Sequence, residues 1–241
     1  MKIVFSRKGF DSSSGGGPSP IVDGRPVSLP IPAGAASRTT YGDLGLGDHV
    51  AKASRGKLGA GDLCHHDPMF TVDGHCLFGQ VGAAQTHLAN REVGLGDVFL
   101  FFGLFREEVA GEPHHRIFGW MEVEEIIDLS SGIPAWLVEA GHPHALAMHG
   151  ANDCIYVGPG GTAARAGVPL RLTVPDGPPS LWHRPEWLKP GGLSYHDRTD
   201  RWLPGGRLKS VARGQEFVAD VGRRKAPREW LARVLAELKG T

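Results

Sequence analysis

The sequence predicts an α+β fold in which a strongly bent, mixed or antiparallel β-sheet or barrel is accompanied by a few short helices and covered by a C-terminal helix. Two apolar stretches, Val98–Phe102 and Ile117–Val123, have the length and composition of paired central strands. The 241 residues include 35 glycines and 18 prolines, which favours short elements and many loops. The last part of the chain carries one apolar stripe at helical spacing.

Residues 80–123 form the predicted centre of the sheet. Gln80–Glu92 is expected to be a helix, because its apolar residues recur at helical spacing. Gly94–Asp97 ends this helix, since glycine readily adopts the left-handed dihedral angles of a helix C-terminus. Val98–Phe102 is an unbroken apolar run with turn residues on both sides, which predicts a strand buried on both faces. Ile117–Val123 is its predicted partner strand.

The N-terminal segment combines a strand with a glycine- and serine-rich loop. Lys2–Phe5 is predicted as a short central strand, and the loop that follows to Pro20 begins with Arg7 and Lys8. Backbone N–H groups and two cations in such a loop can hold an anion. A flexible surface loop is the alternative by composition, and the ending of a P-loop is absent.

The remaining elements are predicted from turn residues and apolar runs. Asp23 and Gly24 predict a hairpin turn between Ile21–Val22 and Val27–Ile31. Further strands are predicted at 124–129, 154–157, 170–173 and 214–218, with a weak helix or loop in 45–60, a helical turn at 135–140, an irregular segment at 142–146 and a tight loop at 158–161.

The C-terminal helix has the clearest pattern in the chain. Pro227 suits its first turn and Glu229 its positive end. Its apolar stripe predicts docking on the sheet, with no role in chemistry. Because the chain shows no internal repeat and no linker, residues 1–241 are predicted to form a single domain. The stripe consists of Trp230, Leu231, Val234, Leu235 and Leu238.

Composition restricts the classes of function. The 26 basic and 26 acidic residues cancel, which argues against a nucleic-acid binder that relies on phosphate contacts alone, although the region 213–228 is basic. No apolar run reaches about 18 residues, so we expect no membrane segment. Residues 1–5 lead into a polar loop, unlike a signal peptide. Three scattered cysteines favour a reduced, cytoplasmic setting.

Two segments carry candidate polar chemistry. The first segment holds several possible metal ligands, but neighbouring side chains of an extended segment point to opposite faces. These ligands are Asp62, Cys64, His65, His66 and Asp67. A structural turn with one functional histidine is therefore favoured, and a metal site would need further ligands. The candidates for those ligands are His142, His144 and His196; His142, His144 and His149 are also candidate general acids or bases, with solvent-exposed histidines as the alternative.

The segment 80–87 and the tryptophans suggest binding of a base. The side-chain amides of Gln80 and Gln85 could form hydrogen bonds with the planar edge of a base. The alternative is that they cap loops and face water. Trp120, Trp182 and Trp202 could stack on a base, with core packing as the alternative. Motifs for a serine nucleophile or a dinucleotide are absent.

Two resemblances to known families follow from these stretches. Gly96–Phe102 with Ile117–Val123 looks like the core of PUA-like domains, including the EVE and ASCH groups, which are small curved β-barrels that bind RNA or modified bases. Across most of its length the chain resembles the third family of nucleotide modification associated domains, found in bacteria and phages. The matching stretches are 5–12, 16–21, 28–32, 79–88, 96–103 and 193–196.

The family resemblance implies a link to base modification in nucleic acid and marks two site segments, Ser6–Ser12 and Gln80–His87. We expect these segments to share one polar cavity. Within it Arg7 and Lys8 would hold phosphate, and His66 or His87 would transfer a proton. The predicted catalytic residues are His66, Asp67, His87 and Asp11, and the predicted substrate-binding residues are Ser6, Arg7, Lys8, Ser12, Gln80, Gln85, Tyr195 and His196.

The predicted function is therefore that of a nucleotide- or base-directed protein, a transferase or hydrolase of a DNA base-modification pathway. Its expected partners are a nucleotide, nucleobase or nucleic acid, and other DNA-modification proteins. The sequence identifies no cofactor, and this interpretation assigns no metal ligand. The alternatives are a non-catalytic reader that stacks a modified base, and a metal-dependent enzyme that uses the segment Cys64–Asp67.

Overall fold

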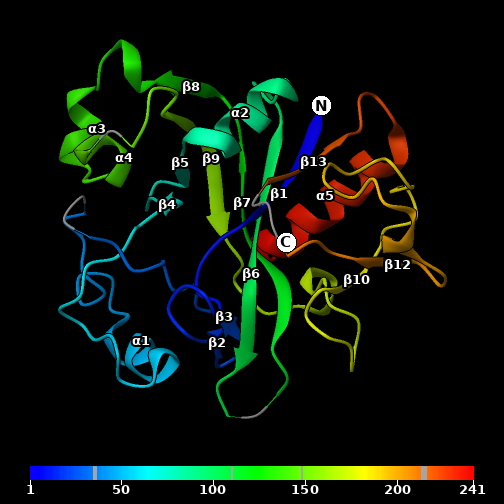
Figure 1. Ribbon diagram of the computed structural model, residues 1–241, viewed down its shortest axis with the longest axis horizontal. Helices are drawn as coiled ribbons and strands as arrows, with labels where there is room; N and C mark the ends of the chain where they lie inside the picture. The colour runs from blue at the N-terminus through cyan, green and yellow to red at the C-terminus, as the bar shows by residue number, and fades with distance from the viewer. Residues whose placement is uncertain (35–36, 110, 148, 213–215) are drawn as a thin grey trace.

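The computed structural model describes residues 1–34, 37–109, 111–147, 149–212 and 216–241. In these residues the fold is α+β, as predicted: ten strands form one strongly curled mixed sheet, three form a small antiparallel sheet, and five α-helices lie around them (Figure 1). No helix in the described part of the chain is both long and apolar enough to cross a membrane.

The elements have the following bounds. The large sheet contains β1 (Lys2–Arg7), β2 (Ser19–Val22), β3 (Arg25–Pro26), β4 (Met69–Phe70), β5 (His75–Gln80), β6 (Val98–Glu107), β7 (His114–Glu122), β8 (Glu125–Asp128), β9 (Cys154–Thr162) and β13 (Glu216–Asp220). The small sheet contains β10 (Leu181–His183), β11 (Trp202–Leu203) and β12 (Arg207–Lys209). The helices are α1 (Gly47–Ser54), α2 (Gly82–Asn90), α3 (Ala135–Glu139), α4 (Pro143–Leu146) and α5 (Lys225–Lys239), with 3-10 turns at Leu129–Ser131, Val168–Leu170 and Thr199–Arg201.

The large sheet has the strand order β13-β1-β6-β7-β9-β5-β4. Strand β1 is central, as predicted, and runs parallel to β6 and antiparallel to β13. The predicted antiparallel pairing of β6 with β7 is confirmed. Strand β2 adds to the far end of β6 in parallel, and β8 pairs with β9.

Both faces of β6 are buried, which confirms the interpretation of its unbroken apolar run. Val98, Leu100 and Phe102 pack in one core with α5 and the small sheet. Phe99 and Phe101 point the opposite way, into a core shared with β5, β7 and β9. Because successive side chains of a strand alternate between faces, a run of apolar residues is what a sheet between two layers requires.

Helix α5 docks as its apolar stripe predicts. Leu231, Val234 and Leu238 are buried in the same core as Val98 and Leu100. Figure 1 shows the helix on one face of the large sheet, on the same side as the small sheet. Gly240 ends it in the left-handed conformation, with φ of 72°.

Two predictions around glycine were wrong. Helix α2 begins at Gly82, two residues later than expected, because β5 continues to Gln80. The predicted tight loop at 158–161 is part of β9. These glycines allow close packing of strands: a Cβ on Gly158 would collide with the carbonyl oxygen of Glu122, and one on Gly160 would lie 2.6 Å from the carbonyl oxygen of Trp120.

Other local predictions differ in smaller ways. The turn at Asp23 and Gly24 is confirmed, with both residues at positive φ, but only residues 25–26 return as a strand. Residues 124–129 hold the separate strand β8, and 170–173 lack a strand, because only single bridges form at Arg171 and Thr173. The weak helix within 45–60 is α1, and 142–146 contains the short helix α4. In the last strand, residues 214 and 215 lie outside the described residues.

Candidate functional site

A polar cavity of about 320 Å³ opens where the segment after β1 meets the end of β5 and the start of α2. Its walls come from four parts of the chain, together with Ile31. These are part of the segment 7–14, His65 with Asp67, part of the segment 79–84, and His144 with His149; the lining residues of the two segments are Arg7, Lys8, Gly9, Asp11, Ser14, Gly79, Gln80, Val81 and Ala84. The structure thus places Arg7, Lys8 and Asp11 in one cavity with Gln80, the juxtaposition of segments expected from the sequence, and Asp67 lines the same cavity.

Glu216 does not line this cavity, but it contacts residues from two of its walls. Its Oε1 accepts hydrogen bonds from Ser6 Oγ at 3.1 Å, Lys8 Nζ at 3.2 Å and Gln80 Nε2 at 2.5 Å. The contact with Gln80 links β13, the first strand of the order, to β5, the last but one, so the sheet curls almost onto itself here. Burial raises the pKa of Glu216, against the opposing effects of Lys8 and its other hydrogen-bond donors. The sequence contained no signal for this residue.

The positively charged side chains of Arg7 and Lys8 are held in place by contacts with neighbouring residues. The guanidinium of Arg7 donates to the carbonyl oxygens of Val211 and Ala212 at 2.8 and 2.9 Å, and burial lowers its pKa from the ordinary value. The ammonium of Lys8 lies 4.2 Å from the centre of the Phe78 ring. Both positive charges are thus positioned at one side of the cavity by contacts within the fold.

Asp67 supplies a buried carboxylate. The backbone N–H of Gly79 donates to its Oδ1 at 2.8 Å. His142 Nε2 lies 3.4 Å from the same oxygen, outside hydrogen-bond geometry. Burial alone would raise the pKa of Asp67, but the proximity of His142 and the charge of Lys8 outweigh it and hold the pKa well below its ordinary value. The group is an anion at neutral pH.

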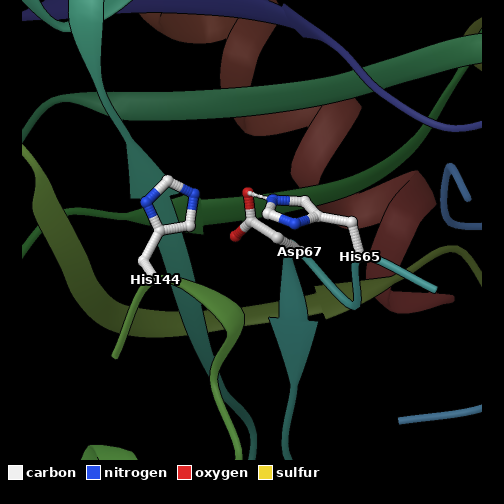
Figure 2. Close-up of side chains that lie close together, drawn as sticks. All are labelled: His65, Asp67 and His144. Atoms are coloured by element: carbon white, nitrogen blue, oxygen red, sulfur yellow. Dashed lines mark ion pairs between the residues drawn. The ribbon is translucent and has the colours of Figure 1, made fainter. Parts of the chain in front are cut away.

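Two histidines face this carboxylate. Nδ1 of His144 lies 2.5 Å from Oδ1 of Asp153, and the other ring nitrogen of His144 is turned towards Asp67 (Figure 2). Nε2 of His65 lies 3.9 Å from Oδ2 of Asp67, and burial lowers the pKa of His65 to about 4. One ligand atom from each of His65, Asp67 and His144 lies within 4.8 Å of the others. Such a trio can move a proton or hold a cation.

The segment Cys64–Asp67 divides between two sides, as alternation in an extended chain requires. His65 and Asp67 line the cavity. Cys64 is buried beside Phe10, and burial raises the pKa of its thiol to about 11. His66 lines a separate cavity of about 230 Å³, which Lys8 and Asp67 also reach. The four residues therefore do not converge, and the third member of the trio comes from α4.

Some predicted site residues on and near α2 lie elsewhere. Nε2 of His87 is 3.0 Å from Ser194 Oγ, and its ring packs on Tyr195 at 4.4 Å. Gln85 accepts a hydrogen bond from the hydroxyl of Tyr156 at 3.0 Å. These contacts orient the side chains within the fold, and none of these residues lines the 320 Å³ cavity.

Among the other predicted site residues, some line the cavity and others do not. Asp11 lines the cavity, and its Oδ1 accepts from the backbone of Ser13 and Ser14 in a local turn. Ser6 is buried beneath the cavity, where it contacts Glu216. Ser12 is exposed and His196 is fully buried, so neither lines it. Alternation along β1 separates Ser6 from Arg7.

The tryptophans are not positioned to stack a base in this cavity. Trp120 and Trp182 are buried in the core shared with α5, which fits the alternative of core packing. Trp202 donates its indole N–H to the carbonyl oxygen of His196. Within the described residues, no phenylalanine, tyrosine or tryptophan lines the cavity.

Comparison with known proteins gives one match. The model of the family described as nucleotide modification associated domain 3 matches residues 2–220. The match therefore includes every segment that lines the cavity. No curated protein and no solved structure matches the chain.

Proposed function

Since the chain belongs to the nucleotide modification associated domain 3 family, we propose that its 320 Å³ cavity binds a nucleotide or a flipped nucleobase and catalyses a step of DNA base modification. The reaction class is group transfer or hydrolysis assisted by proton transfer. Other proteins of the same pathway are its expected partners.

The composition of the cavity supports a charged, polar substrate. Its volume falls at the lower end of the range for small-molecule sites. Arg7 and Lys8 place positive charge on one side, which suits a phosphate. Gln80 uses one amide hydrogen for Glu216, and its Oε1 accepts from the backbone N–H of Val81 at 3.3 Å, so its second amide hydrogen and the other lone pair of the oxygen remain for a base edge.

One observation carries the catalytic interpretation: Asp153 orients His144 so that its free ring nitrogen faces the Asp67 carboxylate inside the cavity. A histidine held by a carboxylate is the usual arrangement of a general base. A non-catalytic reader would stack the base on an aromatic ring, and no phenylalanine, tyrosine or tryptophan lines this cavity in the described part of the chain.

Mass spectrometry tests this proposal directly. The protein is incubated with nucleoside monophosphates, free nucleosides, and single- and double-stranded DNA oligonucleotides. We expect a mass change in one class of substrate, which His144→Gln abolishes. A reader would bind without changing the mass of any of them.

Titration calorimetry tests the binding part. Arg7→Ala should weaken nucleotide binding at least tenfold, whereas Arg165→Ala, which removes an exposed arginine away from the cavity, should not. Circular dichroism checks that both variants fold. Equal affinity of the Arg7→Ala variant and the natural protein would contradict the assigned phosphate site.

A further inference from the structure

We propose that His65, Asp67 and His144 bind one divalent first-row transition-metal ion in the cavity, with at least one coordination position left open. The three side chains come from two segments that are far apart in the sequence, and a ligand atom of each lies within 4.8 Å of the others. Figure 2 shows all three directed at one point.

Among the described residues, each of the three side chains has at least one donor atom that makes no hydrogen bond. Asp153 occupies Nδ1 of His144, which leaves Nε2. The N–H of Gly79 occupies Oδ1 of Asp67, which leaves Oδ2. Nε2 of His65 already lies 3.9 Å from that oxygen. The existing hydrogen bonds therefore select the donor set that a metal would use.

The distances fit with a small adjustment. Bonds of about 2.0–2.1 Å to nitrogen and oxygen in tetrahedral geometry separate neighbouring ligands by roughly 3.3 Å. The separations of the trio, 3.9 Å for one pair and at most 4.8 Å for the others, must therefore shorten by about 0.6 to 1.5 Å. His65 can supply this movement, because it belongs to an extended segment outside the named strands and is only partly buried.

The surroundings of His144 match the outer shell of a metal site. Histidine ligands usually donate their second ring N–H to a carboxylate, which fixes the tautomer and raises the basicity of the ligand. Asp153 does this, and its Oδ2 also accepts from the backbone N–H of His149 at 2.9 Å. One carboxylate thus holds both histidines of this segment.

The donor set selects the class of ion. Two imidazoles and one carboxylate suit Zn²⁺, Fe²⁺, Co²⁺ or Mn²⁺ better than Ca²⁺ or Mg²⁺, which prefer oxygen ligands. The ring of His149 lies 4.7 Å from that of His144 and also lines the cavity. This inference rests on the proposed function and deepens it: with an ion bound, Nε2 of His144 serves as a ligand, and the ion would supply the proton chemistry by activating water or polarising a substrate oxygen. Metal binding is nevertheless measurable without any nucleotide.

The test uses Co²⁺ with the full chain, free of any histidine tag and stripped with EDTA. Visible absorption and calorimetry should show one Co²⁺ per chain. His65→Ala and His144→Ala should each weaken binding more than tenfold, and Asp153→Asn by about 10–100-fold. His75→Ala removes an exposed histidine of β5 outside the cavity and serves as the matched control.

Several results would overturn the inference. The first is the absence of saturable Co²⁺ binding by the natural chain. The second is unchanged Co²⁺ affinity of the His65→Ala variant, which should fold because His65 is partly exposed. The third is loss of Co²⁺ binding in the Cys64→Ser variant, which would indicate that the segment Cys64–Asp67 supplies the ligands. Nucleotide binding is measured in EDTA at the same time. Retained nucleotide affinity without Co²⁺ binding would reject the metal site and leave the proposed function standing.

Discussion

The imidazole of His144 rests on the backbone of Gly79: a Cβ added at this glycine would lie 2.7 Å from Nε2 of the ring and closer still to its carbon atoms. The same glycine donates its N–H to Asp67. One residue without a side chain therefore positions both a carboxylate and a histidine of the candidate site.

Replacing Gly79 by alanine should displace His144. Because the new methyl group overlaps the ring, we expect the free energy of unfolding to fall by about 1–3 kcal/mol and catalytic turnover to be lost. Urea denaturation and mass spectrometry of the products measure the two effects. Gly61→Ala is the control, since a Cβ there meets no atom within 4 Å. Full turnover in the Gly79→Ala variant would show that His144 has no catalytic role.

Lys8 and Glu216 should be strongly coupled. The two side chains are almost fully buried and 3.2 Å apart. Lys8→Met leaves the carboxylate without its cation and should lower the free energy of unfolding by about 3–5 kcal/mol. Adding Glu216→Gln should restore more than half of this loss, which a double-mutant cycle measures. Lys52→Met, which breaks an exposed pair with Glu108, should change stability little. Additive effects of the two buried substitutions would contradict the coupling.

His115 should make the protein sensitive to acid. Its Nδ1 accepts a hydrogen bond from the indole N–H of Trp182 at 3.0 Å, and burial, with the charge of Arg7, lowers its pKa to about 3. In the unfolded chain the pKa is about 6.5, so the unfolded state takes up the proton first. The free energy of unfolding should therefore fall as the pH drops from about 6.5 towards 3, by up to about 1.4 kcal/mol per pH unit.

Urea denaturation between pH 7 and pH 4 tests this dependence. The His115→Gln variant keeps an acceptor for the indole of Trp182 but does not titrate, so its stability should depend less steeply on pH. Other titrating groups contribute equally to both proteins, and the difference in slope therefore isolates His115. Identical slopes would show that His115 does not control the acid response.

Docking of α5 should contribute measurably to stability. Leu231 is buried between this helix and the sheet. Truncation to alanine removes buried methyl groups and leaves a cavity, which should cost about 2–5 kcal/mol in chemical denaturation. Leu95→Ala, at a position with 70% of its surface exposed, is the matched control and should have little effect. A similar small effect at Leu231 would mean that the helix is only loosely attached.

Local patterns in the sequence predicted much of the sheet and less of the site. The apolar run 98–102, the partner strand in 117–123 and the terminal helix follow directly from residue spacing. The glycines led to wrong predictions, because glycine occurs both in turns and in closely packed strands, and the local sequence does not distinguish the two. This ambiguity produced the errors at the start of α2 and in β9.

The candidate site was also predicted only in part. The family resemblance is confirmed, and it marked the segments that carry Arg7, Lys8 and Gln80, which the fold brings together. It could not separate these from Gln85 and His87, because Gln80 ends strand β5 whereas Gln85 and His87 lie on α2, and the local sequence pattern did not mark where the strand ends and the helix begins.

By itself, the sequence determined the family, the fold class and which strands are central, since the apolar residues that become buried recur at the spacing of a helix or form the unbroken runs of a buried strand. Only the tertiary structure decided that the curled sheet brings Glu216 against Gln80, and that Asp153 turns His144 towards Asp67. Such contacts join residues distant in sequence across strands whose order and curvature no local pattern records.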